Sequence, residues 1–480
     1  MALTRRGFIG AAAMSGAATL ARGASAGQSK GRLLRFGVLS DVHISLYCTQ
    51  ESYQRIHMEK ALRWFDAQGV DAVVFPGDMI HSGIVSEMEI FADVWNRVFP
   101  GGRGADGRAV EKMLVTGNHE IAMWKGRIND LGQKEWDERE GLLPRIGETW
   151  ERLFGEKYEK VFMKKIKGVT FVGAQYLTCN PPIEKFLKEH AGELPKGRPF
   201  FFVQHAHPSG TCYGMTKIAA DGGRATRALS PFPWAVALSG HSHNPLTDDR
   251  SVWQGAFTSI GCGSAWNAGD DYLEGHDNAT QFAKKQYENA RMESVWKYRK
   301  GYDSGRHCMM VDVYPDHLDI VRRSIDFAQS LGPDWRVPLP AAPGGPFDFA
   351  RCARETKPPE FEKGAAAVFF PGRKQSLQGK IGKRLRGKPY VGLMFPTATA
   401  GEGRVYDYVV EASAGGKTLA TSKLLTESAP FPPGFMQVGE ACLFGREELA
   451  EGVDIDISIT PRNCYGVSGR PLKMVVRLGT

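Results

Sequence analysis

Side chains that bind divalent metal ions recur along the first half of the chain, each time shortly after an apolar run. The first pair is Asp41 and His43, which follow the run 33–39. On a strand, residues two apart point to the same side, so this carboxylate and this imidazole can reach one ion. Later runs lead into Asp78, into Asn118 and His119, into His205 and His207, and into His241 and His243. Such a mixture of donors suits transition-metal ions.

These donors need a scaffold that brings distant loops together. The apolar runs are short enough to be buried strands, and they lie at 33–39, 72–76, 113–116, 200–204 and 234–239. Helical amphipathicity at 53–68 separates the first two runs, which predicts a strand-helix-strand unit with parallel strands. A layered α/β fold collects such strand ends at one edge of its sheet. Further helix and strand patterns lie at 86–99, 162–176, 257–262 and 309–313.

The order of these motifs is Asp-x-His, Gly-Asp, Gly-Asn-His, His and Gly-His-x-His, and it spans roughly Arg32 to Ser324. As an ordered set it resembles the calcineurin-like metallophosphoesterase family. The resemblance implies an α/β fold, a sandwich of two mixed β-sheets flanked by helices. It also implies a metal-dependent phosphoesterase.

The family's metal ligands can be carried over residue by residue. The resemblance makes Asp78 the carboxylate that bridges two ions. It assigns Asp41, His43 and His243 to one ion, and Asn118, His205 and His241 to the other. His205 is preferred to His207 because it ends its strand directly, which leaves His207 as a neighbour that contacts phosphate. His119 is implied to act on the phosphate, by stabilising charge or by protonating the departing oxygen.

The expected chemistry is hydrolysis of a phosphate ester at a centre of two divalent ions. Two ions about 3.5–4 Å apart can stabilise both the attacking and the leaving oxygen and lower the pKa of a water between them. Imidazole and carboxylate donors favour manganese, iron or zinc. We favour a phosphodiesterase slightly over a phosphomonoesterase, and the motifs leave the substrate open. The rival interpretation is a secreted binding protein with an inactive phosphoesterase-like core, which predicts a broken ligand set.

The N-terminus has the parts of an export signal. The segment 4–9 contains Arg5 and Arg6 followed by Gly-Phe-Ile, an Ala- and Gly-rich apolar stretch runs to Leu20, and the segment 24–26 reads Ala-Ser-Ala. We expect a twin-arginine signal peptide at 1–26 and a periplasmic or otherwise exported protein. The apolar stretch is shorter than the ~20 residues that span a bilayer, so no transmembrane segment is expected after cleavage.

The composition changes towards the C-terminus. We expect the catalytic domain at 32–330, a Pro-rich linker at 331–350 and a β-sandwich domain at 351–480. Strand-length patterns at 405–412, 418–424, 453–460 and 472–478, separated by turn residues, resemble immunoglobulin or fibronectin type III modules in texture. No catalytic constellation is found there, and a contact with a surface or a glycan is left open for this domain.

Charge and cysteine content limit the remaining alternatives. The formal net charge of +8 includes three arginines of the predicted signal peptide, so the remaining bias is too small to argue for a nucleic-acid partner. The eight cysteines include no Cys-x-x-Cys pair, which speaks against a zinc ribbon or a thioredoxin-like site. We expect mainly core thiols, and disulfide pairing stays open.

Two features of the sequence have no assigned role in the chemistry. The first is the set of remaining histidines, expected to be surface or hydrogen-bonded structural residues: His57, His81, His190, His276, His307 and His317. Among them His81 is the most doubtful, because it lies three residues after Asp78. The second is the segment 266–307, rich in Tyr, Trp, Arg and Lys, which either roofs the site or forms a solvated helix.

Overall fold

The computed structural model describes residues 31–45, 52–121, 141–176, 182–212, 220–268, 305–370, 387–399, 405–426, 431–433 and 439–479. The predicted signal peptide lies outside these residues, as do Cys48, Cys179 and most of the segment 266–307.

The first sheet has the order β12-β11-β10-β1-β2-β3, and β13 pairs with β11. Its parallel part consists of β1 (Leu34–Val38), β2 (Ala72–Pro76) and β3 (Glu111–Val115). Its antiparallel part consists of β10 (His307–Val313), β11 (His317–Ser324), β12 (Gln329–Ser330) and β13 (Trp335–Pro338). The carboxyl ends of β1, β2 and β3 therefore meet at one edge.

The second sheet has the order β4-β5-β6-β7-β9-β8. Parallel pairing joins β5 (Val169–Ala174), β6 (Phe200–Val203), β7 (Ala235–Ser239) and β9 (Thr258–Gly261). Antiparallel strands close its two edges, β4 (Val161–Ile166) and β8 (Val252–Gln254). Both sheets are thus mixed, and the predicted metallophosphoesterase fold class is confirmed.

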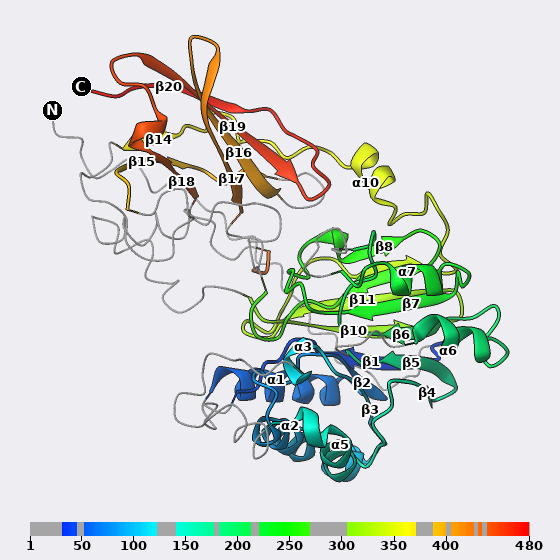
Figure 1. Ribbon diagram of the computed structural model, residues 1–480. Helices are drawn as coiled ribbons and strands as arrows, with labels where there is room; N and C mark the ends of the chain where they lie inside the picture. Colours follow the sequence, from blue (N-terminus) through cyan, green and yellow to red (C-terminus); the bar gives the residue numbers. More distant parts are fainter. Residues whose placement is uncertain are drawn as a thin grey trace. The chain divides into compact units, whose positions relative to one another are not determined.

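Helices cover the outer face of each sheet (Figure 1). The first sheet packs against α1 (Tyr53–Ala67), α2 (Val85–Val98) and α5 (Ile146–Phe154), and the second against α6 (Ile183–Glu189) and α7 (Arg224–Leu229). On α1 the buried positions 58, 61, 62 and 65 form one apolar stripe, and the buried His57 beside them contacts Asp326. Shorter helical turns are α3 (Asn118–Ile121), η1 (Pro100–Gly102), η2 (Leu143–Arg145) and η3 (Asp249–Ser251).

A second apolar core joins the inner faces of the two sheets. The Phe36 ring on β1 meets Phe171 on β5 and Phe201 on β6 edge to face, with centroid distances of 5.6 and 5.0 Å. All three side chains are fully buried. Because these rings link strands from both sheets, they fix the sheets against each other and thereby align the strand ends that carry the donors.

The C-terminal strands form two antiparallel sheets after α10 (Phe349–Glu355). One contains β14 (Val368–Phe370), β15 (Tyr390–Phe395) and β18 (Glu440–Gly445), which η4 (Arg446–Glu448) follows. The other contains β16 (Val405–Ala414), β17 (Lys417–Leu425), β19 (Asp454–Asn463) and β20 (Leu472–Arg477). Side chains of both sheets share one apolar core. The predicted all-β region is confirmed, and its likeness to immunoglobulin or fibronectin modules stays a prediction.

The segment predicted as a linker contains an edge strand. β13 pairs with β11, and Trp335 and Val337 are buried in the core between the two α/β sheets. Pro338, at its end, is compatible with an edge strand, where a missing N–H costs no ladder bond. The domain borders themselves stay predictions.

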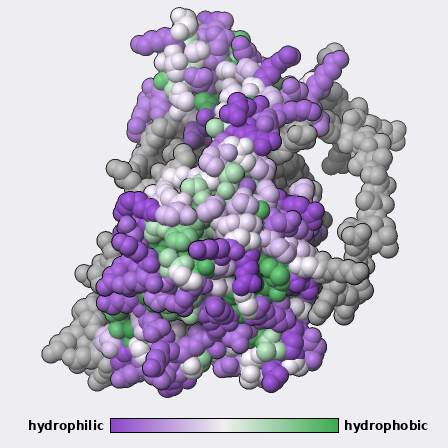
Figure 2. Space-filling view, turned by 90° about the vertical axis from the view of Figure 1, so that its right-hand side faces the viewer, coloured by the Kyte–Doolittle hydropathy of each residue, from purple (hydrophilic) through white to green (hydrophobic). Residues whose placement is uncertain are grey.

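The surface view in Figure 2 shows mainly hydrophilic residues with smaller apolar areas between them. Among the described residues, the large apolar side chains that are exposed are spread along the chain: Leu33, Tyr53, Leu143, Val368, Val453 and Val475. Within the described residues, no helix combines the length and apolarity that crossing a membrane requires.

Candidate metal centre

The predicted metal ligands lie on loops at the carboxyl ends of β1, β2, β3, β6 and β7, and several have an uncommon backbone conformation. Five of them have positive φ angles: Asp41 (53°), His43 (54°), Asp78 (50°), His241 (70°) and His243 (53°). For residues other than glycine this left-handed conformation costs on the order of 1 kcal/mol or more each, and it concentrates at functional sites. The loops are therefore held in a strained form that points their side chains to one place.

Two glycines let these loops approach each other closely. A Cβ atom at Gly117 would collide with the carboxylate and the backbone nitrogen of Asp78. A Cβ atom at Gly240 would collide with the side chains of Ser40 and Asp41. The Gly that precedes a donor is thus required for contact between loops as well as for turning the chain.

The first cluster of donors contains Asp41, His43, Asp78 and His243, whose ligand atoms lie within 4.8 Å of one another. His243 Nε2 is 3.1 Å from Asp41 Oδ1 and 3.2 Å from His43 Nε2. His43 Nε2 is also 3.7 Å from Asp78 Oδ2. Two carboxylates and two imidazoles thus converge on one point.

The second cluster contains Asp78, His205 and His241. His205 Nε2 lies 3.1 Å from Asp78 Oδ2 and 3.1 Å from Asn118 Oδ1. His205 Nδ1 faces the Pro76 carbonyl oxygen at 2.8 Å, which fixes the ring and leaves Nε2 for the centre. Asp78 is the one residue common to both clusters.

The electrostatics of the site fit a pair of cations. Asp41, His43, Asp78 and His205 are all buried. Burial alone would raise the pKa of the Asp78 carboxyl, but the neighbouring His205 lowers it far below its usual value. Burial alone would also raise the pKa of Asp41, but the neighbouring His243 lowers it below its usual value. Two buried carboxylates that stay ionised require positive charge nearby, which divalent ions would supply.

The environment shifts the pKa values of two histidines of the centre in opposite directions. Burial lowers the pKa of His43 well below its ordinary value, so this ring is neutral and has a lone pair for a cation. For His205 burial also lowers the pKa, but the attraction of Asp78 outweighs it and raises the pKa to about 9. In the metal-free protein His205 therefore carries a proton, and this positive charge partly replaces the charge that a cation would supply.

His119 lies beside the centre. Its backbone N–H donates to Asp78 Oδ1 at 2.9 Å, and its Nδ1 faces the His81 carbonyl oxygen at 2.6 Å. Its Nε2 is 4.0 Å from Asp78 Oδ2. The side chain is 14 % exposed, so it is partly accessible from solvent. Because Nδ1 is held by this carbonyl, Nε2 is the ring nitrogen that faces Asp78 and the centre.

His207 has a different environment. It is fully buried, with Nε2 at 2.9 Å from Ser242 Oγ and Nδ1 at 3.8 Å from Cys212 Sγ. Burial lowers its pKa to about 3, so the ring is neutral. The contact with phosphate stays a prediction, whereas the contacts with Ser242 and Cys212 join the ring to a neighbouring loop and to the core.

Glu120 was not predicted from the sequence as part of the site. This fully buried carboxylate accepts hydrogen bonds from the backbone N–H groups of Asp78, at 3.1 Å, of Ile80, at 2.9 Å, and of Gly117. It therefore connects the loop after β2 with the loop after β3. The available signal was its place directly after Asn118 and His119, in a loop already assigned to the centre.

Two further aromatic rings, for which the sequence indicated no definite role, lie at the centre. His81 is buried and contacts both His43 and His119. Trp266 packs on the rings of His43 and His243, with centroid distances of 4.6 and 5.8 Å. Trp266 begins the segment that we expected to roof the site or to form a solvated helix. This first residue lies against the centre, whereas residues 269–304 fall outside the described part of the chain.

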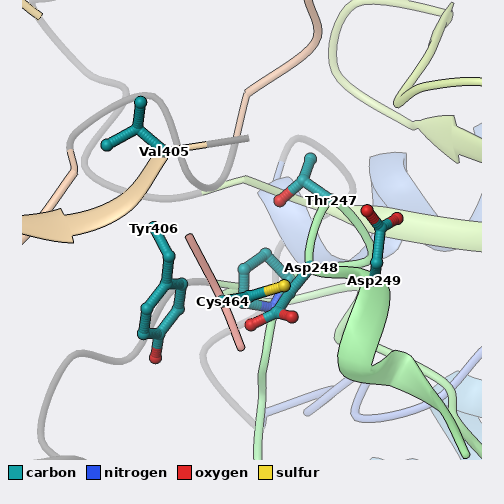
Figure 3. A pocket seen from close by; sticks show the side chains of 7 residues that line it. Thr247, Asp248, Asp249, Val405, Tyr406 and Cys464 are labelled. Carbon is teal, nitrogen blue, oxygen red and sulfur yellow. The ribbon is translucent and has the colours of Figure 1, made fainter. Parts of the chain in front are cut away.

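The loop that follows His243 contributes to a small pocket (Figure 3). Its lining residues are Pro245, Thr247, Asp248, Asp249, Val405, Tyr406 and Cys464, and its volume is about 10 Å³. That is roughly the space needed by a single water molecule. This pocket is therefore too small to be a substrate site.

The comparisons with known proteins agree with this geometry. Residues 34–245 match the family model of the calcineurin-like phosphoesterases. The matched residues include all the predicted metal ligands, and the order of the motifs predicted a resemblance to the same family. A search of the curated proteins finds no match.

Several solved structures resemble the chain weakly, and each match covers 64% of it. A purple acid phosphatase from yellow lupin is 12% identical, with 53% of its length covered and a TM-score of 0.41. A dimetal phosphatase from Danio rerio is 10% identical, with 99% covered and a TM-score of 0.33. An uncharacterised protein from Streptococcus pneumoniae, described as a predicted phosphoesterase, is 12% identical, with 97% covered and a TM-score of 0.29.

Proposed function

We propose that the chain hydrolyses phosphate esters at a centre of two divalent cations. One observation carries this proposal: the buried carboxylate of Asp78 belongs to two clusters of metal-binding side chains at once. Asp41, His43 and His243 complete one cluster, while Asn118, His205 and His241 surround the other side of Asp78. No predicted ligand is missing from the sequence, which favours an enzyme over a binding protein with an inactive core.

The residues of the chain divide the work between binding and proton transfer. When bound, the two cations would supply a water of lowered pKa and positive charge for the attacking and leaving oxygens. Asp78 would hold both cations. Asp41, His43 and His243 would hold one of them, and Asn118, His205 and His241 would hold the other. Asn118 contributes a neutral oxygen, which limits the negative charge that faces an anionic phosphate.

His119 is suited to protonate the leaving oxygen. Its Nδ1–H donates to the His81 carbonyl, so in the doubly protonated ring the proton on Nε2 would face the centre. A proton delivered from a positioned imidazole helps most when the leaving oxygen is strongly basic. The chain thus supplies an acid on the side of the centre where His119 lies, next to His43 at 4.5 Å between ring centroids.

The finer assignments belong to the same proposal. Imidazole and carboxylate donors favour manganese, iron or zinc. We favour phosphodiesters slightly over phosphomonoesters, and the N-terminal sequence favours activity outside the cytoplasm. A phosphate-ester substrate is the partner that this centre requires, whereas a surface or glycan contact of the C-terminal sheets is a separate proposal.

The proposal is tested with protein that starts after residue 26, loaded with manganese or zinc. Bis-p-nitrophenyl phosphate and p-nitrophenyl phosphate distinguish diester from monoester hydrolysis, and nucleotides, phospholipids and sugar phosphates extend the panel. We expect turnover that a chelator abolishes and added metal restores. Protein that binds two cations per chain but hydrolyses none of these esters would support the binding-protein alternative.

A further inference from the structure

We infer that His81 is a positioning residue for the centre: its ring holds the metal ligand His43, and its backbone carbonyl holds His119. The inference rests on the proposed function, because it concerns the roles assigned there to these two histidines. His81 itself is 7 % exposed and lies on the loop after β2, three residues from Asp78.

The first contact links two imidazoles. His43 Nδ1 lies 3.3 Å from His81 Nδ1, while His43 Nε2 faces His243 and Asp78. To bind a cation, His43 Nε2 must keep its lone pair, so its proton must be on Nδ1. His81 Nδ1 then accepts that proton's hydrogen bond and carries no proton of its own. Partners of this kind fix the tautomer and the orientation of a metal-binding histidine.

The second contact uses the backbone of the same residue. His119 Nδ1 lies 2.6 Å from the His81 carbonyl oxygen. A carbonyl oxygen can only accept, so His119 Nδ1 carries a proton, and Nε2 is left to exchange one with the leaving oxygen. A change of the His81 side chain leaves this carbonyl in the chain. The two contacts of His81 can therefore be separated by mutation.

The backbone of His81 is held independently of its ring. Its N–H donates to the Ile44 carbonyl oxygen at 2.8 Å and contacts Glu87 Oε2 at 3.2 Å. The next N–H, of Ser82, donates to the same Glu87 oxygen at 2.7 Å, and Glu87 is fully buried at the start of α2. Trp266 packs against the rings of both His43 and His81, at 4.6 and 5.5 Å between centroids. The loop should thus keep its path when the ring is replaced.

The experiment compares two substitutions of similar size. In His81→Asn the side-chain oxygen can occupy the place of Nδ1 and accept the bond from His43, whereas His81→Leu offers no acceptor. The metal-free proteins are titrated with Mn²⁺ and with Zn²⁺ by calorimetry, and bound metal is counted after dialysis. His317→Leu is the matched control, because His317 lies on β11 and contacts Asp316 and Asp319 rather than the centre.

We expect His81→Leu to weaken one of the two metal sites by about 10–100-fold, the usual effect of losing such a partner. His81→Asn should remain within a few fold of the unmodified protein, and His317→Leu should not differ from it. Thermal unfolding in chelator should give similar midpoints for all variants. At saturating metal, the ratio of alkyl-ester to nitrophenyl-ester turnover should be unchanged in His81→Leu, because the carbonyl that holds His119 remains.

Several results would overturn the inference. His81→Leu with unchanged affinity at both sites would show that the ring does not position His43. His43, His81 and His119 could also hold an ion by themselves; three bound cations, reduced to two by both substitutions, would make His81 a ligand. Unmodified protein that binds two cations without hydrolysing any ester would contradict the proposed function alone, whereas protein that binds none would contradict both.

Discussion

Two regions of the molecule differ in buried charge and in backbone strain. One is the edge of the α/β sandwich that carries the predicted metal ligands, here called the metal end, and the other is the pair of C-terminal β-sheets. In the C-terminal sheets, the buried Asp407 has a two-pronged ion pair with Arg462, at 2.8 and 2.5 Å. Within the described part of the chain, the ion-pair partners of Asp41 and Asp78 are all imidazoles. The carboxylate of Asp407 is thus neutralised by an arginine of the same chain, whereas the carboxylates of the metal end require added cations.

Backbone strain follows the same division. Five predicted ligands have positive φ angles, but among the described residues after 348 only glycines do. Strained loops and incompletely neutralised carboxylates both cost stability, so they persist where function requires them. The comparison teaches that the α/β sandwich sacrifices stability at one edge, while the C-terminal sheets show no comparable site in their described part.

The largest effect is expected where one carboxylate serves both clusters. Asp78→Asn should lower turnover by more than the roughly 10²–10³-fold that loss of a single stabilising group costs, because both cations lose a charged ligand. Metal content is measured alongside activity. His43→Asn is the comparison variant, because His43 is proposed to bind only one of the two cations. If Asp78→Asn keeps two metals per chain and near-normal turnover, the bridging role is wrong.

Replacement of His119 should have a smaller effect that depends on the substrate. General acid catalysis contributes typically 10²–10⁴-fold, and most of it is needed for poor leaving groups. His119→Ala should therefore lose far more activity on alkyl phosphate esters than on nitrophenyl esters, with both metals retained. An equal loss in both series would rule out the acid role and leave charge stabilisation or positioning.

In the C-terminal sheets the matching change should affect stability without affecting catalysis. Asp407→Asn leaves Arg462 and Lys423 without their carboxylate, which should cost about 1–3 kcal/mol of unfolding free energy. Denaturant unfolding measures this cost, and turnover per folded molecule should be unchanged. A large loss of turnover in folded Asp407→Asn protein would show that the two regions are coupled.

The smallest effect concerns pH. His207 has a pKa of about 3 in the folded protein, below the ordinary 6.5, because burial disfavours its charged form. The unfolded chain thus takes up a proton first, so stability is complete above pH 6.5 and is lost as the pH falls. Between pH 6.5 and 5.5 the loss is about 1 kcal/mol. In metal-free protein, His207→Gln should show a shallower decline, and an identical slope would contradict the assignment.

The parts of the fold that the sequence predicts well are those with a local pattern. The apolar runs before Asp41, Asp78 and His205 are strands because their side chains are buried on both faces, and that requires no knowledge of the partners. The segment 331–350 is predicted as a linker because its prolines are typical of loops, but it contains the strand at 335–338. Its pairing with β11 depends on a tertiary contact that local composition does not encode.

The candidate site divides in the same way. The predicted ligands belong to motifs with a fixed order, and the structure brings Asp41, Asp78 and His241 to one edge. The contacts of Glu120, His81 and Trp266 depend on the conformation of their loops, which sets where each side chain or carbonyl points. That direction depends on hydrogen bonds to loops far away in the chain, such as the bond from Asp78 N to Glu120. Sequence spacing alone does not contain it.

The division of the ligands between the two sheets also determines when the centre can form. The first sheet provides Asp41, His43, Asp78 and Asn118, and the second provides His205, His241 and His243. The contact between Asp41 and His241 closes a loop of 200 residues. Bringing together residues so distant in sequence costs the entropy of closing a long loop. Each cluster takes donors from both sheets, so the sheets must dock before either cluster is complete, and a cation bound there would oppose their separation.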